Sequence, residues 1–283
     1  MIWVTSRQHQ REASIALGLV AITALLLVFE WFQIVAATNR LGLNSCQGAA
    51  LASSNCNNAL SSFMQDFFGL SVVVRYFLTS LPALLGVFIA APLVSREVEE
   101  GTHMFVWTQS ITRIRWLSTK VILLGLATLA LAGLLSILVL WWHQPFDRMY
   151  AAGRWTFFDV MGLAPIAYAL FALALGVCAG AVIQRTVPAM AATLVVFVAV
   201  RVAVYLWRPW FLPPMTLQLP TPASTLEGVW QVGTASYGEV NQTIIYQPPE
   251  RFWTFQGLEA GIFLLLSLAL ILASFLWLRY RVH

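Results

Sequence analysis

Six long apolar runs alternate with polar segments along the chain, and each run is long enough to cross a membrane. The predicted spans cover residues 14–35, 76–94, 121–142, 160–183, 187–207 and 257–278. A helix needs about 20 apolar residues to cross the hydrocarbon core of a bilayer. None of the runs alternates with the period of two that marks a barrel strand, so the pattern predicts α-helices.

Two segments near the N-terminus leave alternatives open. The first run follows Arg7 and Arg11, as in a secretory signal peptide, but it contains Glu30 and exceeds the apolar core of about 7–15 residues found in such peptides. We therefore favour a span. The amphipathic segment Leu60–Leu70 is shorter, and we expect it to lie at the membrane surface as an interfacial helix.

The composition agrees with a membrane location. Of the 283 residues, 59% are hydrophobic and only 10% are charged, whereas a soluble domain has about 25% charged residues to cover its surface. This excludes an ordinary cytosolic enzyme, a disordered regulator and a disulfide-rich mini-protein. The net charge of +4 suits cytoplasmic loops of a membrane protein, so we expect lipid and no nucleic acid as a partner.

The distribution of basic residues predicts the orientation. With the N-terminus inside, the inner segments hold nine Lys and Arg residues and the longer outer segments hold six. Cytoplasmic loops carry an excess of Lys and Arg. Both termini are therefore expected in the cytoplasm of a multi-pass protein of the cell membrane, most simply a bacterial one.

This orientation makes 36–75 and 208–256 extracellular loops. Cys46 and Cys56 lie in the first of them with nine residues between them, and an exterior compartment permits a disulfide there; two free thiols are the alternative. The second loop holds seven of the 12 prolines. Such a loop can be rigid and extended, and nothing in its pattern marks a folded domain.

The chain lacks the motifs of the common enzyme classes. No Cys or His pair has zinc-ligand spacing, and neither a GxSxG elbow nor a GxGxxG loop is present. The only lysine, Lys120, does not stand in a GxxxxGK[ST] phosphate loop. We therefore predict no catalytic residue, no metal site and no cofactor in this chain.

The inner loop 95–120 has the most informative pattern. An acidic half with Glu97, Glu99 and Glu100 is followed by Gly101 and Thr102, a short apolar strip, and a basic stretch that leads into the third span. Gly101 is expected to end the helix that continues from the second span. On physical grounds a solvated loop with snorkelling ends is an equally good interpretation.

The motif resembles the first cytoplasmic loop of type-2 ABC transporter permeases. The resemblance rests on Arg96-Glu97-x-x-Glu100-Gly101-Thr102, on Thr108-Gln109-Ser110-Ile111-Thr112-Arg113 and on Arg115-Trp116-Leu117-x-x-Lys120, together with the entry to the last span at Tyr246–Glu259. The six-span plan fits the compact members that are encoded beside a separate ATPase. Ser110 stands where proline is frequent in the family.

The resemblance implies a fold, a function and partners. It implies the all-α, six-span type-2 ABC exporter fold, acting as the non-catalytic permease subunit that moves a hydrophobic or amphipathic substrate such as a drug, a peptide antibiotic or a lipid. Two copies of a cytosolic ABC ATPase would bind ATP and Mg²⁺, and a second permease copy would complete a homodimer. The coupling residues would be Glu97, Glu100, Gly101, Thr102, Phe105 and Arg113.

Two ionisable residues lie inside the predicted spans. Glu30 and Arg201 lie about 24 Å and 21 Å from the inner ends of the first and fifth spans, at about 1.5 Å per helical residue. Charges at membrane depth need a partner or a function. We expect the two residues to pair across helices as an outer gate; the alternative is that each extends to the headgroups by itself.

The fourth span carries small residues at every fourth position, Ala172, Gly176 and Gly180. This spacing predicts a face that packs closely against another helix, more simply one of the same chain. Two further functions remain as alternatives, a secondary transporter or channel and an intramembrane enzyme. The first would need an internal repeat or charges at mid-membrane, and the second a complete set of catalytic residues.

Overall fold

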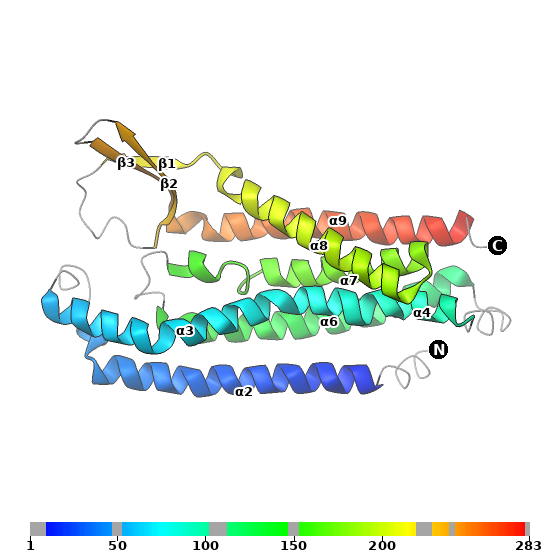
Figure 1. The fold of residues 1–283 in the computed structure, drawn as a ribbon, viewed down its shortest axis with the longest axis horizontal. Coiled ribbons are helices and arrows are strands. Elements are labelled where there is room, and N and C mark those ends of the chain that lie inside the picture. The colour runs from blue at the N-terminus through cyan, green and yellow to red at the C-terminus, as the bar shows by residue number, and fades with distance from the viewer. Residues whose placement is uncertain are drawn as a thin grey trace.

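The computed structural model describes residues 10–46, 53–101, 112–146, 153–218, 228–237 and 241–280. Within these ranges, six helices are long and apolar enough to cross a membrane. They form one elongated bundle with a small sheet at one end (Figure 1). The six predicted spans are all present, and the all-α polytopic class is confirmed.

The helices extend beyond the predicted spans. Their bounds are Gln10–Arg40 (α2), Ser54–Leu85 (α3), Ala91–Glu99 (α4), Arg113–His143 (α6), Ala164–Ile183 (α7), Thr186–Trp207 (α8) and Phe252–Tyr280 (α9). A π-helical segment, Gly86–Ala90, joins α3 to α4, so that the second span runs on to Glu99. Pro82 lies inside α3 just before this segment, where proline removes a backbone donor from the helical ladder.

Capping residues explain where several helices begin and end. The side chains of Ser53 and Thr112 accept hydrogen bonds from the backbone N–H groups of Cys56 and Arg115, which caps α3 and α6. After α4, Gly101 has a φ of 70°, a left-handed conformation that glycine adopts without strain. The expectation that Gly101 ends this helix is confirmed.

The predicted interfacial helix at Leu60–Leu70 is wrong. These residues belong to α3, which continues without interruption into the second span. Figure 1 shows α3 running along the bundle rather than across it. Its apolar side chains pack on the outer part of the bundle instead of on a lipid surface: Phe63 is fully buried and contacts Phe146 with ring centroids 5.9 Å apart.

The two ends of the bundle differ in what they carry. Gln10 and Tyr280, the first and last described residues, lie at the same end, which we call the terminal end (Figure 1). The ends of α4 and α7 and the starts of α6 and α8 lie there too. The opposite end carries the disulfide and the sheet, and we call it the sheet end.

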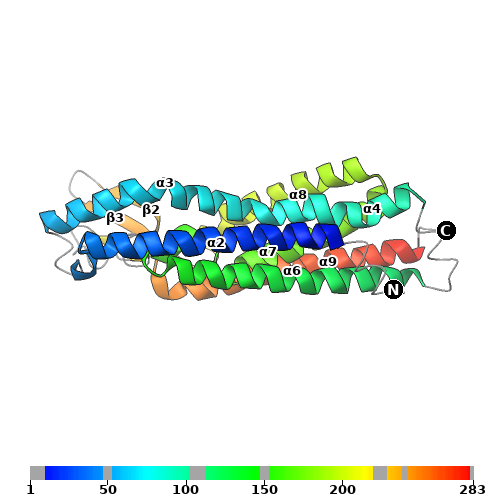
Figure 2. The same ribbon diagram turned by 90° about the horizontal axis from the view of Figure 1, so that it is seen from below.

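Helix α7 forms the centre of the bundle. Of its most apolar stretch, 67% is buried, against 11% to 44% for the other five membrane-length helices. It packs against α3, α4, α6, α8 and α9. Figure 2 shows α2 on the outside of the bundle, alongside α3 and α6.

The small-residue face of α7 packs within the chain, as expected. A Cβ atom on Gly176 would lie 2.6 Å from both the Cβ of Ala90 and the carbonyl oxygen of Gly86, and one on Gly180 would lie 2.7 Å from the carbonyl oxygen of Ala91. Only glycine allows such an approach. Ala172 lies on the same face, opposite Gly86, so this face holds α7 against the π-helical segment and α4.

The loop 208–256 contains a folded element that the sequence analysis missed. Its three antiparallel strands, Met215–Gln218 (β1), Trp230–Tyr237 (β2) and Asn241–Gln247 (β3), are arranged in the order β1-β3-β2. The buried side-chain amide of Gln247 donates to the carbonyl oxygens of Pro209 and Leu212, at 3.2 and 2.8 Å. These bonds tie the sheet to the end of α8.

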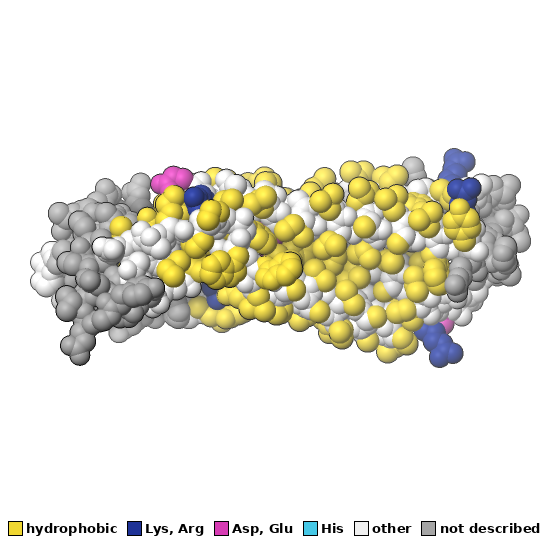
Figure 3. Space-filling view, turned by 90° about the horizontal axis from the view of Figure 1, so that it is seen from above, with side chains coloured by type: hydrophobic (Ala, Val, Ile, Leu, Met, Phe, Trp, Pro, Cys, Tyr) yellow, Lys and Arg dark blue, Asp and Glu magenta, His cyan; other side chains and the backbone are white. Residues whose placement is uncertain are grey.

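The bundle surface has the composition of a membrane-embedded surface. Figure 3 shows hydrophobic side chains over the middle of one face, with the charged side chains toward the two ends. Exposed apolar residues occur on all the outer helices, including Phe29 on α2, Ile137 on α6, Val195 on α8 and Leu265 on α9. A patch of this extent would not stay in water, and in a bilayer it faces lipid.

Candidate functional site

The predicted coupling residues lie around the turn between α4 and α6 at the terminal end. Thr102 and Phe105 lie outside the described residues, and so does the side chain of Arg113. The structure therefore shows the two flanks of this segment. Glu97, Glu100 and Gly101 form its first flank, and Lys120 lies on its second.

The first contact between the flanks is a buried ion pair. The Nζ of Lys120 lies 2.6 Å from Oε1 of Glu97 and donates to the backbone carbonyl of Leu93 at 3.3 Å. The same ammonium group lies 4.6 Å from the ring centre of Trp116. Lys120 is only 4% exposed, so it does not snorkel to the membrane surface. Its charge is balanced by Glu97 on α4.

A second contact joins α4 to the start of α8. Oε2 of Glu99 accepts hydrogen bonds from the backbone N–H of Thr186 at 2.8 Å and from its hydroxyl at 2.7 Å. Thr186 is the first residue of α8, where backbone N–H groups have no partner within the helix and a carboxylate is favoured. The hydroxyl of Ser95 lies 3.4 Å from that of Thr186 and extends the contact.

The third acidic residue is held locally. Nε of Arg96 donates to Oε1 of Glu100 at 2.8 Å, one helical turn away, and both side chains are more than half exposed. An exposed pair of this kind contributes a few tenths of a kcal/mol at most. All three acidic side chains therefore accept hydrogen bonds or pair with cations inside the chain.

The contacts of Glu97 and Glu99 make the end of α4 a junction. Glu97 connects it to α6, Glu99 connects it to α8, and Gly101 then turns the chain toward the segment between the flanks. Buried apolar side chains from α4, α6, α7 and α9 pack beneath these contacts, among them Val94, Leu117 and Leu278. A displacement of the inner loop would therefore act on several spans at once. We call this group of contacts the α4 junction.

The predicted pair of Glu30 and Arg201 is wrong. Arg201 contacts two other carboxylates, with Nη2 lying 3.2 Å from Oδ1 of Asp159 and Nη1 lying 3.3 Å from Oε1 of Glu259. Glu30 is buried on α2, while Figure 1 shows α2 and α8 on opposite sides of α7. Similar depth in the membrane therefore did not bring the two side chains together.

Arg201 is part of a buried charge cluster at the sheet end. Its members are Asp159, Tyr168, Arg201, Arg208 and Glu259. Arg208 binds Glu259 through two parallel bonds, from Nε to Oε2 at 2.7 Å and from Nη2 to Oε1 at 2.9 Å, and Nη2 also donates to Asp159. The hydroxyl of Tyr168 donates to Glu259.

The cluster is electrically balanced, with two guanidinium groups and two carboxylates. The guanidinium carbon of Arg201 lies 3.5 Å from the ring centre of Tyr168, and that of Arg208 lies 4.1 Å from that of Phe158. Burial raises the pKa of Asp159, but the positive charges of Arg208 and Arg201 outweigh that effect and leave its pKa below the ordinary value. The carboxylate is therefore kept ionised.

Of this cluster, the sequence analysis singled out only Arg201. Asp159 and Glu259 lie near the starts of the fourth and sixth spans, and Arg208 directly follows the fifth. A useful signal was available, because all three residues lie within a few residues of the predicted outer end of a span. Charges that enter the membrane at the same end can meet even when they are far apart in the sequence.

The remaining predictions concern the disulfide and metals. Cys46 and Cys56 form a disulfide with Cα atoms 5.7 Å apart, which settles the choice between a bridge and two free thiols. It connects the end of the 3₁₀ turn after α2 to the first turn of α3. In the part of the chain that the structure describes, no group of three His, Cys, Asp or Glu residues could hold a metal ion.

Six membrane-length helices in one bundle, with an α4 junction at one end and a sheet at the other, define a polytopic α-helical membrane protein. The chain belongs to the family described as ABC-2 membrane transporter related, which matches residues 17–208, more than half of its length. It is thus a permease subunit of the ABC-2 type, a family that associates with an ABC ATPase. Searches among curated proteins and solved structures return no match.

Proposed function

We propose that the chain is the permease subunit of an ATP-driven exporter in a bacterial cell membrane. Two copies of a separate ABC ATPase bind ATP and Mg²⁺, and two copies of this chain form the pathway. The substrate is hydrophobic or amphipathic, such as a drug, a peptide antibiotic or a lipid. The chain itself hydrolyses nothing.

The observation that carries this proposal is the α4 junction. A non-catalytic permease needs a rigid path from its cytosolic contact to its spans, because the ATPase can bias the membrane subunit only through differential contacts. Glu97 and Glu99 connect the helix before the inner loop to α6 and α8, at 2.6 Å and 2.7 Å. A displacement of the helix end before the inner loop would therefore be transmitted to the second, third and fifth spans.

Residues at the two ends of the bundle support a cytoplasmic location for the terminal end. Arg96, Arg115, Arg185 and Arg279 are found there, together with Lys120. The sheet end carries the disulfide, which forms in an exterior compartment. With the terminal end in the cytoplasm, the excess of Lys and Arg and the position of the disulfide are both accounted for.

The test is a charge reversal in the inner loop, made together with a change in its apolar strip. The chain is expressed with its ATPase, and the variant Glu100→Arg/Phe105→Asp is compared with the wild type for co-purification of the ATPase. We expect the variant to lose most of the bound ATPase, because it reverses a charge and buries a new one at the contact.

The matched control is Glu250→Arg, the same change on an exposed glutamate at the sheet end. We expect the control to retain the ATPase. Retention of the ATPase by both variants, with unchanged ATP turnover in the complex, would refute the assignment of this loop. Loss in both variants would mean that charge reversal acts through folding and not through the contact.

A further inference from the structure

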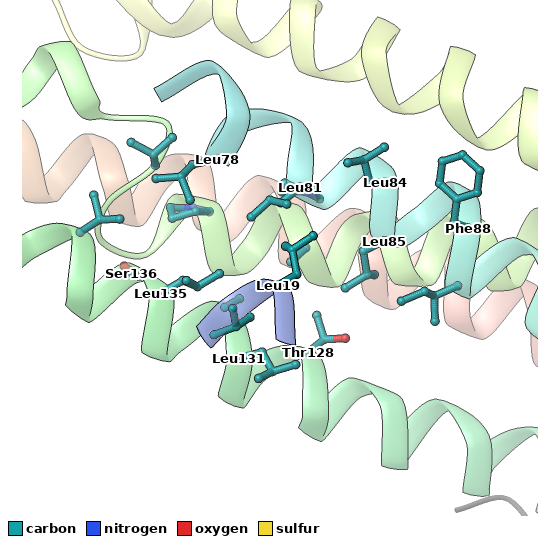
Figure 4. A pocket seen from close by; sticks show the side chains of 18 residues that line it. Leu19, Leu78, Leu81, Leu84, Leu85, Phe88, Thr128, Leu131, Leu135 and Ser136 are labelled. Carbon is teal, nitrogen blue, oxygen red and sulfur yellow. The ribbon is translucent and has the colours of Figure 1, made fainter. Parts of the chain in front are cut away.

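An apolar pocket of about 540 Å³ lies among α2, α3, α6 and α7. Figure 4 shows its wall, with Leu19 from α2, Leu81 and Leu85 from α3, and Leu131 and Leu135 from α6 pointing into the same space. None of the residues that line it belongs to the α4 junction or to the buried charge cluster. Its residues all belong to membrane-spanning segments or to the residues directly before α7.

The pocket is open toward the membrane and closed toward the protein. Phe88 and Leu84 at its edge are exposed on the bundle surface, whereas Leu78, Val139 and Val160 at its inner wall are buried. The exposed edge belongs to the surface that faces lipid. A molecule dissolved in the hydrocarbon core can therefore enter the pocket without crossing water.

The lining selects an apolar occupant. None of the 18 lining residues is charged, and only Thr128 and Ser136 carry a polar side-chain group. The hydroxyl of Ser136 donates to the carbonyl oxygen of Gly162 at 2.6 Å, so its donor is already used. An apolar cavity stays dry, and even one of about 150 Å³ can bind a molecule such as benzene.

Volume and surroundings together identify the occupant. A pocket of about 540 Å³ falls in the range of about 300–1,000 Å³ that holds small-molecule ligands. Left empty, its walls would lose dispersion contacts on one side. The apolar group in highest concentration at this depth is the acyl chain of a membrane lipid, and its flexible, narrow shape fits a slot between helices.

We propose that one acyl chain of a membrane phospholipid occupies this pocket and fills the space between α2 and the helices α3 and α6. The lipid is a resident part of the fold, distinct from the general lipid shell around the bundle. It contacts α2 at Leu19 and Val20, where the same helix is otherwise exposed at Leu17 and Ile22. The acyl chain therefore supports the packing of the first span against α3 and α6.

The experiment uses the purified full chain in phosphatidylcholine vesicles that contain a trace of a phospholipid with a diazirine on the middle of one acyl chain. After illumination, the labelled peptides are mapped by mass spectrometry. We expect labelling at Leu81–Leu85 and Leu131–Leu135 to exceed labelling at the exposed residues Leu194–Val196 of α8 by several-fold. It should also saturate as the amount of photolipid increases.

Two substitutions to phenylalanine sharpen the test. Ala132→Phe places a ring in the pocket, and we expect it to reduce labelling there several-fold while labelling at α8 stays unchanged. Ala199→Phe makes the same change on the exposed face of α8 and should leave pocket labelling intact. If Ala132→Phe does not fold, the wild-type map alone decides.

Equal labelling of the pocket and of α8, in proportion to the photolipid added, would overturn the proposal, because it describes ordinary lipid around the bundle. Unchanged labelling in a folded Ala132→Phe variant would also overturn it. Pocket labelling that reaches a plateau while labelling at α8 keeps rising in proportion to the photolipid would support it, since only a site with limited capacity saturates.

Discussion

Removing one of the two cations of the buried charge cluster should strongly destabilise the protein. Arg208 is 3% exposed and Glu259 is fully buried. Arg208→Met removes two bonds to Glu259, at 2.7 and 2.9 Å, and one to Asp159. It leaves two carboxylates facing the single guanidinium of Arg201, which lies farther away, at 3.2 and 3.3 Å.

The magnitude follows from these contacts. A hydrogen bond to a charged group contributes about 1.5–3 kcal/mol, and removing one partner of a buried ion pair costs about 3–5 kcal/mol. Because Arg201 still offsets part of the excess negative charge, we expect Arg208→Met to lower the free energy of unfolding by about 3–5 kcal/mol. The exposed Arg279 provides the control: Arg279→Met should change it by about 0.5 kcal/mol or less.

A double variant separates charge balance from simple loss of contacts. Arg208→Met/Glu259→Gln leaves one cation and one carboxylate, Arg201 and Asp159, so the charges balance again. We expect the double variant to lose about 1–3 kcal/mol less stability than the sum of the losses of the two single variants. Unfolding in mixed micelles with increasing sodium dodecyl sulfate measures all four proteins. Strict additivity, or a cost of Arg208→Met below about 1 kcal/mol, would refute the reasoning.

Three further outcomes are expected. Gly176→Leu should lower the free energy of unfolding by about 1–3 kcal/mol or more, because a Cβ there meets the backbone of the second span. Gly133→Leu, where a Cβ has open space, should be close to neutral, and thermal unfolding in detergent compares the two variants. Cys46→Ser should cost about 2 kcal/mol, and a reducing agent should then have no further effect on the unfolding midpoint. Lys120→Met should destabilise the α4 junction by about 3 kcal/mol, and Lys120→Arg should recover much of it; the ATP turnover of the complex should follow the same order.

The spans could be predicted from the sequence because the physics of the bilayer leaves few choices. A run of about 20 apolar residues must form a helix in lipid. The small-residue face of α7 was also readable, since Gly176 and Gly180 allow a close approach that larger residues forbid. In the same way, Gly101 marked the end of α4 because only a residue tolerant of positive φ suits that position.

The charge contacts could not be predicted, because the sequence gives the depth of a residue in the membrane but not which neighbouring helix its side chain faces. Glu30 and Arg201 were placed at similar depth, yet α2 and α8 are separated by α7 (Figure 1). Two side chains at one depth meet only when their helices are neighbours and both face inward. For Glu97, the acidic pattern was visible, but its partner Lys120 lies 23 residues farther on, in the next span.

The sheet was missed because its prolines dominated the interpretation of the loop. Met215–Gln218 follows Pro213 and Pro214, and Gln247 precedes Pro248 and Pro249. The β-branched residues of β3, Thr243, Ile244 and Ile245, were a strand signal. Proline is typical of edge strands and of strand ends, and here the prolines lie where strand pairing stops.

The central claim is that this permease works through an ATPase that contacts its inner loop. The most direct measurement is substrate flux across vesicles that contain the chain together with its ATPase, with ATP supplied on the ATPase side. We expect flux that requires ATP hydrolysis and falls to background without the ATPase. Flux by the chain alone, driven by a proton or sodium gradient and indifferent to ATP, would contradict the account and favour a secondary transporter.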